Sequence, residues 1–143
     1  MIDYSARILF VAAVDKEAAA LPEGTPLLVT GIGTLPAAIS LTEYLTVARE
    51  EGTLPERVVN IGTVGALRDG LDGVYEVDRV VKHDFQLKVL SDISRYLLPE
   101  VIELPTSSKF PVQGLATGDM FVSDTATRDR LAVDSGLCDM EGY

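Results

Sequence analysis

The fold is decided by residues 26–65, which read PLLVTGIGTLPAAISLTEYLTVAREEGTLPERVVNIGTVG. The apolar run at residues 26–30 predicts a strand, and residues 36–51 carry apolar side chains near helical spacing before Gly52, which predicts a helix. A further apolar run at residues 57–61 predicts another strand. Strand, helix and strand in this order predict a parallel β-α-β unit with a right-handed crossover.

The segments on either side extend this unit into an α/β domain. Residues 7–14 are mostly apolar and predict a strand buried on both faces, and residues 18–21 predict a short helix that ends at Pro22. Further along the chain we expect, in order, a strand at 74–83, a surface loop with one helical turn at 84–108, a strand at 113–117, a helix at 125–133 capped by Ser123 or Asp124, and a strand at 137–140. Because the sequence contains no repeat and no linker, we predict a single domain over residues 1–143.

Composition and charge exclude several classes of protein. The 12 Lys and Arg residues against 22 Asp and Glu residues give a formal net charge of −10, which argues against nucleic acid and anionic membrane as partners. The single cysteine, Cys138, cannot form an internal disulfide bond, and no Cys/His cluster has the spacing of a metal site, so we expect neither a metal ion nor a cofactor. The longest apolar run, residues 8–14, is far shorter than the roughly 18 residues of a spanning helix. The first residues lack the basic start of a signal peptide, so we expect a cytoplasmic protein.

Carboxylates, glycines and an aromatic residue follow the predicted strands at their carboxyl ends. In open α/β sheets, ligands bind at this edge. The residues are Glu17, Gly31 with Gly33, Gly62 with Thr63 and Gly65, Asp119 with Phe121, and Glu141. Two glutamates and several glycine loops at one edge favour acid–base and hydrogen-bond chemistry on a small polar ligand.

Each of these residues also has a purely structural interpretation. Gly31-Ile32-Gly33 lacks the third glycine of a dinucleotide-binding loop and can be a tight turn between strand and helix. The other structural interpretations are a turn without function for residues 62–65, a solvated or helix-capping carboxylate for Glu17 and Glu141, a core residue for Phe121, and a turn residue for Asp119.

No competing catalytic motif is present in the sequence. It contains no phosphate-binding loop ending in Gly-Lys-Ser/Thr, no His-Glu-x-x-His and no Gly-x-Ser-x-Gly. The single histidine, His83, is expected on the surface without a nearby nucleophile, which argues against a Ser-His triad. Cys138 lies within an apolar strand and is expected to be an inert core thiol.

Five short blocks of sequence are informative because of their order along the chain. They are VAAVDKE at 11–17, TGIG at 30–33 with PAA at 36–38, NIGTVGA at 60–66, ATGDMF at 116–121, and DMEG at 139–142. Together they resemble the nucleoside phosphorylase/nucleosidase superfamily, and most closely its methylthioadenosine/adenosylhomocysteine nucleosidases. The resemblance implies a three-layer α/β/α fold around a mixed, largely parallel central sheet. It also implies a homodimer that cleaves the N-glycosidic bond of a purine nucleoside.

The resemblance further implies a role for each matching residue. Glu17 would be the base that polarises the attacking water, and Glu141 would hold the ribose hydroxyls. The residues implied to bind substrate are Gly33, Thr63 and Gly65 in the glycine loops, Phe121 stacked on the purine, and Met140 against the sugar. Cleavage builds positive charge on the sugar, which nearby carboxylates stabilise. Burial of Glu17 beside residues 18–21 is expected to raise its pKa toward the working pH.

The nucleophile is expected to be water rather than phosphate. Phosphorylases of the superfamily carry an arginine just before the glycine loop that follows the third strand, and this sequence has Asn60 there. The charge of Glu17 would repel phosphate, and Arg68, a few residues on, is not an obvious substitute for that arginine. The alternatives are a purine nucleoside phosphorylase that uses phosphate, and a nucleoside-binding fragment without catalysis.

The sequence departs from the superfamily pattern at its end. Members usually continue into a strand ending in Ser-Asp, whose aspartate protonates the leaving purine, and into a closing helix, whereas this sequence ends at Tyr143. Asp119 and Asp139 do not occupy the position of that acid. We therefore expect a catalytic domain that lacks this strand and helix and is nearly inactive by itself. The strand at 137–140 is expected to have an unpaired edge, which favours aggregation or oligomerisation.

Overall fold

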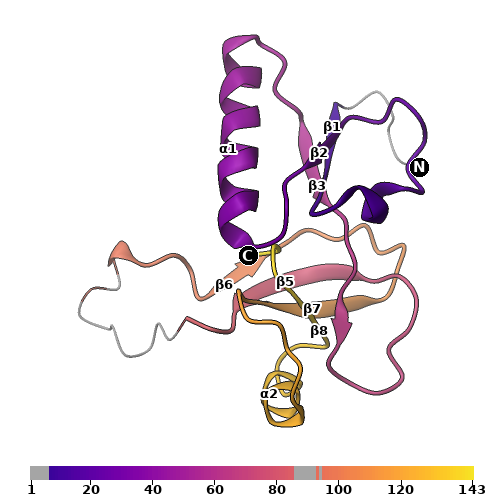
Figure 1. Cartoon of the computed structure of the whole chain (residues 1–143), viewed down its shortest axis with the longest axis vertical. Coiled ribbons are helices and arrows are strands. Elements are labelled where there is room, and N and C mark those ends of the chain that lie inside the picture. The colour runs from indigo at the N-terminus through magenta and orange to yellow at the C-terminus, as the bar shows by residue number, and fades with distance from the viewer. Residues whose placement is uncertain (1–6, 86–92, 94) are drawn as a thin grey trace. The chain divides into compact units, whose positions relative to one another are not determined.

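The computed structural model describes residues 7–85, 93 and 95–143 of the chain (Figure 1). The chain divides between Thr63 and Val64 into two compact units. Each unit contains its own sheet. The single domain over residues 1–143 stays a prediction.

The first unit consists of a three-stranded parallel sheet and one long helix. Its elements are β1 (Ile8–Ala12), the 3-10 turn η1 (Asp15–Ala18), β2 (Leu27–Val29), α1 (Thr34–Glu50) and β3 (Arg57–Asn60) (Figure 1). The strand order is β2-β1-β3, so β1 is the central strand. Leu9 and Ala12, on opposite faces of β1, are 1% and 0% exposed. The parallel β-α-β unit and a strand buried on both faces are therefore confirmed.

The second unit is built on a five-stranded mixed sheet. Its elements are β4 (Gly65–Ala66), β5 (Glu76–Lys82), β6 (Val101–Glu103), β7 (Val112–Thr117), α2 (Thr125–Leu131) and β8 (Leu137–Asp139). The strand order is β4-β8-β7-β5-β6; the inner strands β8, β7 and β5 are parallel, and the two outer strands are antiparallel to their neighbours. The predicted mixed, largely parallel α/β fold class is confirmed.

Apolar side chains from both faces of the five-stranded sheet form two buried clusters. One contains Val80, Leu115 and Leu137, with Tyr143 packed against it. The other contains Leu67, Ala116 and Leu131, the last of these from α2. Since adjacent residues of a strand point to opposite faces, the neighbours Leu115 and Ala116 of β7 enter different clusters. Burial on both faces explains why β7 reads as an apolar run in the sequence.

Two short strands were not predicted from the sequence. Both β4 and β6 are outer strands that pair with longer strands, β4 with β8 and β6 with β5. β6 lies in the segment 84–108 predicted to be a loop, of which residues 86–92 and 94 are outside the described residues. The unpaired edge expected for the strand at 137–140 is wrong, because β4 pairs with β8 on one side and β7 on the other.

The first predicted short helix differs from the structure, whereas the predicted start of α2 agrees with it. The short helix expected at residues 18–21 is wrong; a 3-10 turn at 15–18 begins directly after β1, because the Glu17 side chain accepts hydrogen bonds from backbone N–H groups at the end of that strand. α2 begins after Asp124, whose Oδ1 accepts a hydrogen bond from the Thr127 N–H at 2.8 Å. Of the two expected caps, Asp124 is the one that caps the helix.

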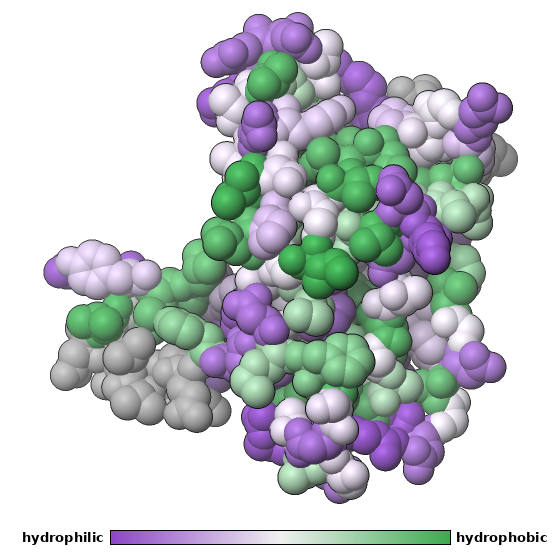
Figure 2. Space-filling model, viewed as in Figure 1, coloured by the Kyte–Doolittle hydropathy of each residue, from purple (hydrophilic) through white to green (hydrophobic). Residues whose placement is uncertain are grey.

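Helix α1 leaves large apolar side chains in contact with solvent. Leu35, Ile39 and Val47 are 69%, 57% and 47% exposed, and Figure 2 shows hydrophobic residues (green) on the surface over this helix.

Within residues 7–85, 93 and 95–143, no helix combines the length and the apolar character that a membrane span requires.

Candidate active site

The carboxylate of Glu17 is the most heavily hydrogen-bonded group in the first unit's predicted site. Its Oε1 accepts hydrogen bonds from the backbone N–H and the hydroxyl of Thr63, both at 2.8 Å. Its Oε2 accepts hydrogen bonds from the N–H groups of Ala13 at 3.1 Å and Val14 at 3.3 Å. The structure thus brings together Glu17 and Thr63, two predicted site residues from the ends of β1 and β3.

Gly62 makes this close approach possible. A Cβ at Gly62 would lie 3.2 Å from Oε1 of Glu17, which is tighter than an ordinary contact. A side chain at this position would require the Glu17 carboxylate to shift, and glycine lets it stay where the Thr63 N–H meets it. Gly62 has a structural role at the candidate site whether or not a ligand binds there.

The electrostatics of Glu17 differ from the prediction. Burial by itself would raise the pKa of Glu17, but the hydrogen bonds from Thr63, Val14 and Ala13 outweigh burial and hold this pKa below its ordinary value. The expected rise in the pKa of Glu17 is therefore wrong, because donors around the carboxylate favour its charged form. Glu17 is ionised at neutral pH.

We expect the ionised Glu17 to stabilise the fold at neutral pH and to lose this contribution in acid. A pKa that is lower in the folded than in the unfolded chain contributes stability above the unfolded value, and this contribution is lost as the pH falls through the folded value. The difference in unfolding free energy between wild type and Glu17→Gln, measured in urea, should therefore be larger near pH 7 than near about pH 3.5. Glu50→Gln, on an exposed position of α1, is the control. An equal difference at both pH values would contradict the prediction.

The glycines after β2 support a tight turn. Gly31 and Gly33 have φ angles of +84° and +106°, a region that favours glycine, and Gly33 is the N-cap residue just before α1. The structural interpretation of Gly31-Ile32-Gly33 as a turn between strand and helix is thus confirmed. The implied contact of Gly33 with a substrate stays a prediction.

The remaining predicted site residues belong to the second unit. Phe121 follows β7 and is 79% exposed, so the interpretation of Phe121 as a core residue is wrong, and its ring is available for stacking. Asp119 forms an ion pair with Lys82, with 3.8 Å between Oδ2 and Nζ, and its N–H donates to Oδ2 of Asp84 at 2.5 Å. Met140 and Glu141 follow β8 and are partly buried.

Gly65 has a clear structural reason to be glycine. It lies in β4 opposite Cys138 of β8, and a Cβ at Gly65 would lie 2.7 Å from the Cys138 sulfur. Burial, followed by the negative charge of Asp139, raises the pKa of the Cys138 thiol. A half-buried thiol with a raised pKa is a poor nucleophile, in agreement with the expectation that Cys138 is inert.

His83 is not on the surface as the sequence suggested. Its side chain is half-buried after β5, and no described residue forms a hydrogen bond with its buried Nε2. Gly118, just after β7, leaves room for the ring, since a Cβ there would collide with Nε2. Desolvation lowers the pKa of His83, so the neutral ring is favoured.

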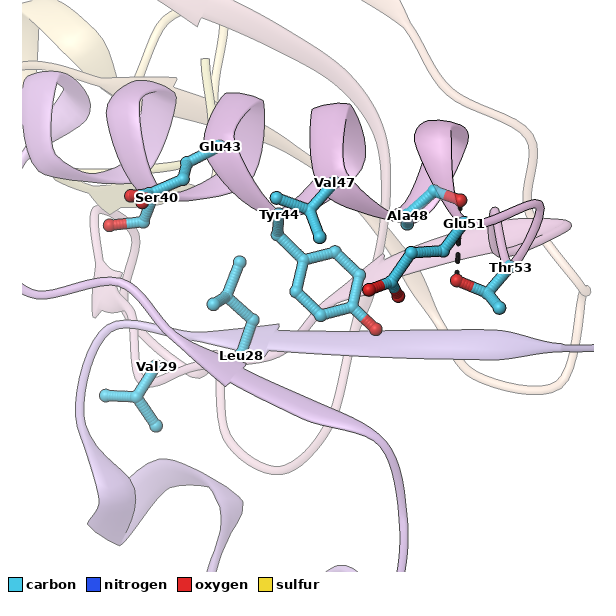
Figure 3. Close-up of a pocket in the computed structure, with 9 residues that line it drawn as sticks. All are labelled: Leu28, Val29, Ser40, Glu43, Tyr44, Val47, Ala48, Glu51 and Thr53. Atoms are coloured by element: carbon cyan, nitrogen blue, oxygen red, sulfur yellow. Dashed lines mark hydrogen bonds between the residues drawn. The ribbon is translucent and has the colours of Figure 1, made fainter.

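The first unit also contains a cavity of about 430 Å³ between α1 and β2 (Figure 3). Its described lining residues include none of those predicted for the site; they are Leu28, Val29, Ser40, Glu43, Tyr44, Val47, Ala48, Glu51 and Thr53. In Figure 3, the Tyr44 ring extends from α1 toward the strand beside Leu28. The candidate active site and this cavity are therefore separate features.

Comparison with known proteins identifies the fold. No protein-family model and no curated protein sequence matches the chain. Among solved structures, S-adenosylhomocysteine nucleosidase from Streptococcus pyogenes, in complex with 5-methylthiotubericidin, is 19% identical with a TM-score of 0.74, over 96% of this chain and 74% of the other. A futalosine hydrolase mutant of Helicobacter pylori is 17% identical with a TM-score of 0.73, over 96% and 80%.

A third solved structure, the MTA/SAH nucleosidase of Streptococcus pneumoniae in complex with 8-aminoadenine, is 19% identical with a TM-score of 0.74. It covers 95% of this chain and 76% of the other. These likenesses establish the class of fold: the chain has the α/β fold found in nucleoside-hydrolysing enzymes. The fold that the sequence blocks implied is thereby confirmed.

Proposed function

We propose that the protein is a nucleosidase that hydrolyses the N-glycosidic bond of a purine nucleoside and releases the free base and the sugar. The observation that carries the proposal is the ionised Glu17 carboxylate, held by Thr63 where β1 and β3 end. The fold supports it, because the similar structures include nucleosidases and a futalosine hydrolase. We propose a substrate of the methylthioadenosine/adenosylhomocysteine type.

Glu17 and Thr63 are proposed to activate the attacking water. The four hydrogen-bond donors around Glu17 fill nearly all the acceptor positions of its carboxylate. The attacking water therefore contacts the Thr63 hydroxyl, whose own proton points to Oε1 of Glu17. As the water oxygen bonds to C1′, its proton passes to Thr63 Oγ1 while the Thr63 proton passes to Glu17. The C1′–N9 bond breaks with its electron pair on the purine, which takes up a proton from bulk water, and Glu17 then returns its proton to bulk water.

Residues of the second unit are proposed to bind the nucleoside. Glu141 holds the ribose hydroxyls, and its negative charge favours the positive charge that develops on the sugar. Phe121, whose ring is 79% exposed, stacks on the purine, and Met140 contacts the sugar. Gly33 and Gly65 allow the backbone to approach the substrate closely, because neither carries a side chain.

Base release should be independent of phosphate. Asn60, the last residue of β3, carries no positive charge to hold a phosphate ion, and the ionised Glu17 repels one. We expect protein expressed from its natural reading frame to release adenine from 5′-methylthioadenosine at the same rate with and without phosphate, with the free sugar as product. A sugar 1-phosphate, or a requirement for phosphate, would instead identify a phosphorylase. Tight nucleoside binding without turnover would identify a binding protein.

A further inference from the structure

The Asp139 carboxyl group lies at the end of β8, beside the proposed ribose-binding residue Glu141. Thr117 of β7 is its direct partner in the parallel register. The Thr117 hydroxyl, on a residue that is 0% exposed, donates a hydrogen bond to Asp139 Oδ1 at 2.5 Å. One oxygen of Asp139 is therefore anchored to the buried centre of the five-stranded sheet.

The same carboxyl group also organises the turn that follows β8. The backbone N–H groups of Glu141 and Gly142 face it closely enough to lower the pKa of Asp139. A Cβ at Gly142 would lie 2.9 Å from Asp139 Oδ2, so the carboxyl group lies against the backbone of this turn. Met140 and Glu141 lie between Asp139 and Gly142, so the Asp139 carboxyl group constrains the backbone from which the Glu141 side chain leaves.

Gly142 fixes this turn from the opposite side. A Cβ at Gly142 would lie 2.5 Å from Leu115 Cδ2, 2.9 Å from Asp139 Oδ2 and 3.1 Å from Thr117 Oγ1. The next residue, Tyr143, packs against the cluster that contains Leu115. The backbone after Glu141 is therefore pressed onto the sheet face that carries Thr117 and Asp139.

The two carboxyl groups also repel each other. Burial raises the pKa of Asp139, the Thr117 hydroxyl lowers it, and the charge of Glu141 raises it further. A half-buried carboxyl group beside a second one is unfavourable unless its hydrogen bonds compensate. The Thr117 hydroxyl donates a compensating hydrogen bond, and the N–H groups of Glu141 and Gly142 also favour the charged form of Asp139.

We propose that Asp139 is a positioning residue that orients Glu141 for ribose binding through the turn at residues 139–142. The inference rests on the proposed function, since it assigns how Glu141 reaches the sugar. Asp139 itself contacts the turn and Thr117 rather than the substrate.

The test is a double-mutant cycle on protein expressed from its natural reading frame. We expect Asp139→Ala and Glu141→Gln each to weaken binding of the analogue 5-methylthiotubericidin by about 10- to 100-fold. The double variant should bind no more weakly than Glu141→Gln alone, because the substituted side chain has already lost the ribose contact that Asp139 would orient. Asp139→Asn keeps an oxygen that accepts from the Thr117 hydroxyl and should bind within about 3-fold of wild type. Asp134→Ala, on an exposed position of the same unit, is the control.

The outcomes separate this inference from the proposed function. Wild type that does not bind the analogue, or Glu141→Gln that binds as well as wild type, would overturn the proposed function and the inference with it. The inference alone would be overturned if Glu141→Gln weakens binding as expected while Asp139→Ala leaves the affinity unchanged. It would also be overturned if Asp139→Ala still weakens binding in the Glu141→Gln background. Should Asp139→Ala fail to fold, Thr117→Val removes one anchoring hydrogen bond, and the same cycle with Glu141→Gln decides.

Discussion

Glu17→Gln should lower the rate of base release by about 10²- to 10⁴-fold and leave nucleoside affinity nearly unchanged. The glutamine side chain cannot take up the proton that the attacking water loses, so the chemical step slows. Binding changes little, because the proposed contacts with the base and ribose come from other residues. The measurement uses protein expressed from its natural reading frame and compares kcat for adenine release with Kd for 5-methylthiotubericidin in wild type and Glu17→Gln.

Matched controls test whether the position of the Glu17 carboxylate matters and whether the Thr63 hydroxyl is needed. Glu50→Gln makes the same chemical change on an exposed position of α1 and should leave kcat unchanged. Thr63→Ser keeps the hydroxyl that donates to Glu17 and should retain most of the activity, whereas Thr63→Val should lose it. A small and equal effect of Glu17→Gln and Glu50→Gln would show that Glu17 is an ordinary surface carboxylate.

Leu137→Ala should lower the free energy of unfolding by about 2–5 kcal/mol. Leu137 is 2% exposed in β8 and forms one cluster with Leu115 of the adjacent strand β7 and Val80 of β5. Loss of its side chain removes apolar burial and leaves a cavity between strands that cannot collapse without distorting the sheet. Leu98→Ala makes the same change at a residue that is 69% exposed and should cost far less.

Urea unfolding of wild type, Leu137→Ala and Leu98→Ala measures these two costs directly. The m-value should stay constant, since the change in stability arises from packing in the folded state. Similar unfolding midpoints for the two variants would show that the cluster around Leu137 contributes little to the fold.

The lowered pKa of Glu17 changes how this residue is expected to act. A carboxylate with a lowered pKa is a weak base toward water in its ground state. As positive charge develops on the sugar, the bound water becomes more acidic, so an ionised and well-oriented acceptor is needed mainly in the transition state. The hydrogen bonds from Thr63, Ala13 and Val14 provide this orientation in advance.

The strand pattern and the position of most candidate residues followed from local sequence. Apolar runs predicted strands close to the observed β1, β2, β3, β5, β7 and β8, and helical spacing predicted α1. These signals are local, because periodicity and chain breakers such as Gly52 act within a few residues. The same locality placed Glu17, the glycine loops and Glu141 just after strands, where the fold leaves them.

Only the tertiary structure decided what these residues contact. β4 and β6 exist because distant strands pair with them, and Glu17 has a lowered pKa because Thr63, 46 positions away, donates to its carboxylate. His83 is half-buried because Gly118 on another segment leaves space for its ring. Residue type and spacing in the sequence determined where the candidate functional residues lie along the chain. Their charge states and orientations depend on pairing, burial and hydrogen bonding between remote segments, which exist only in the folded structure.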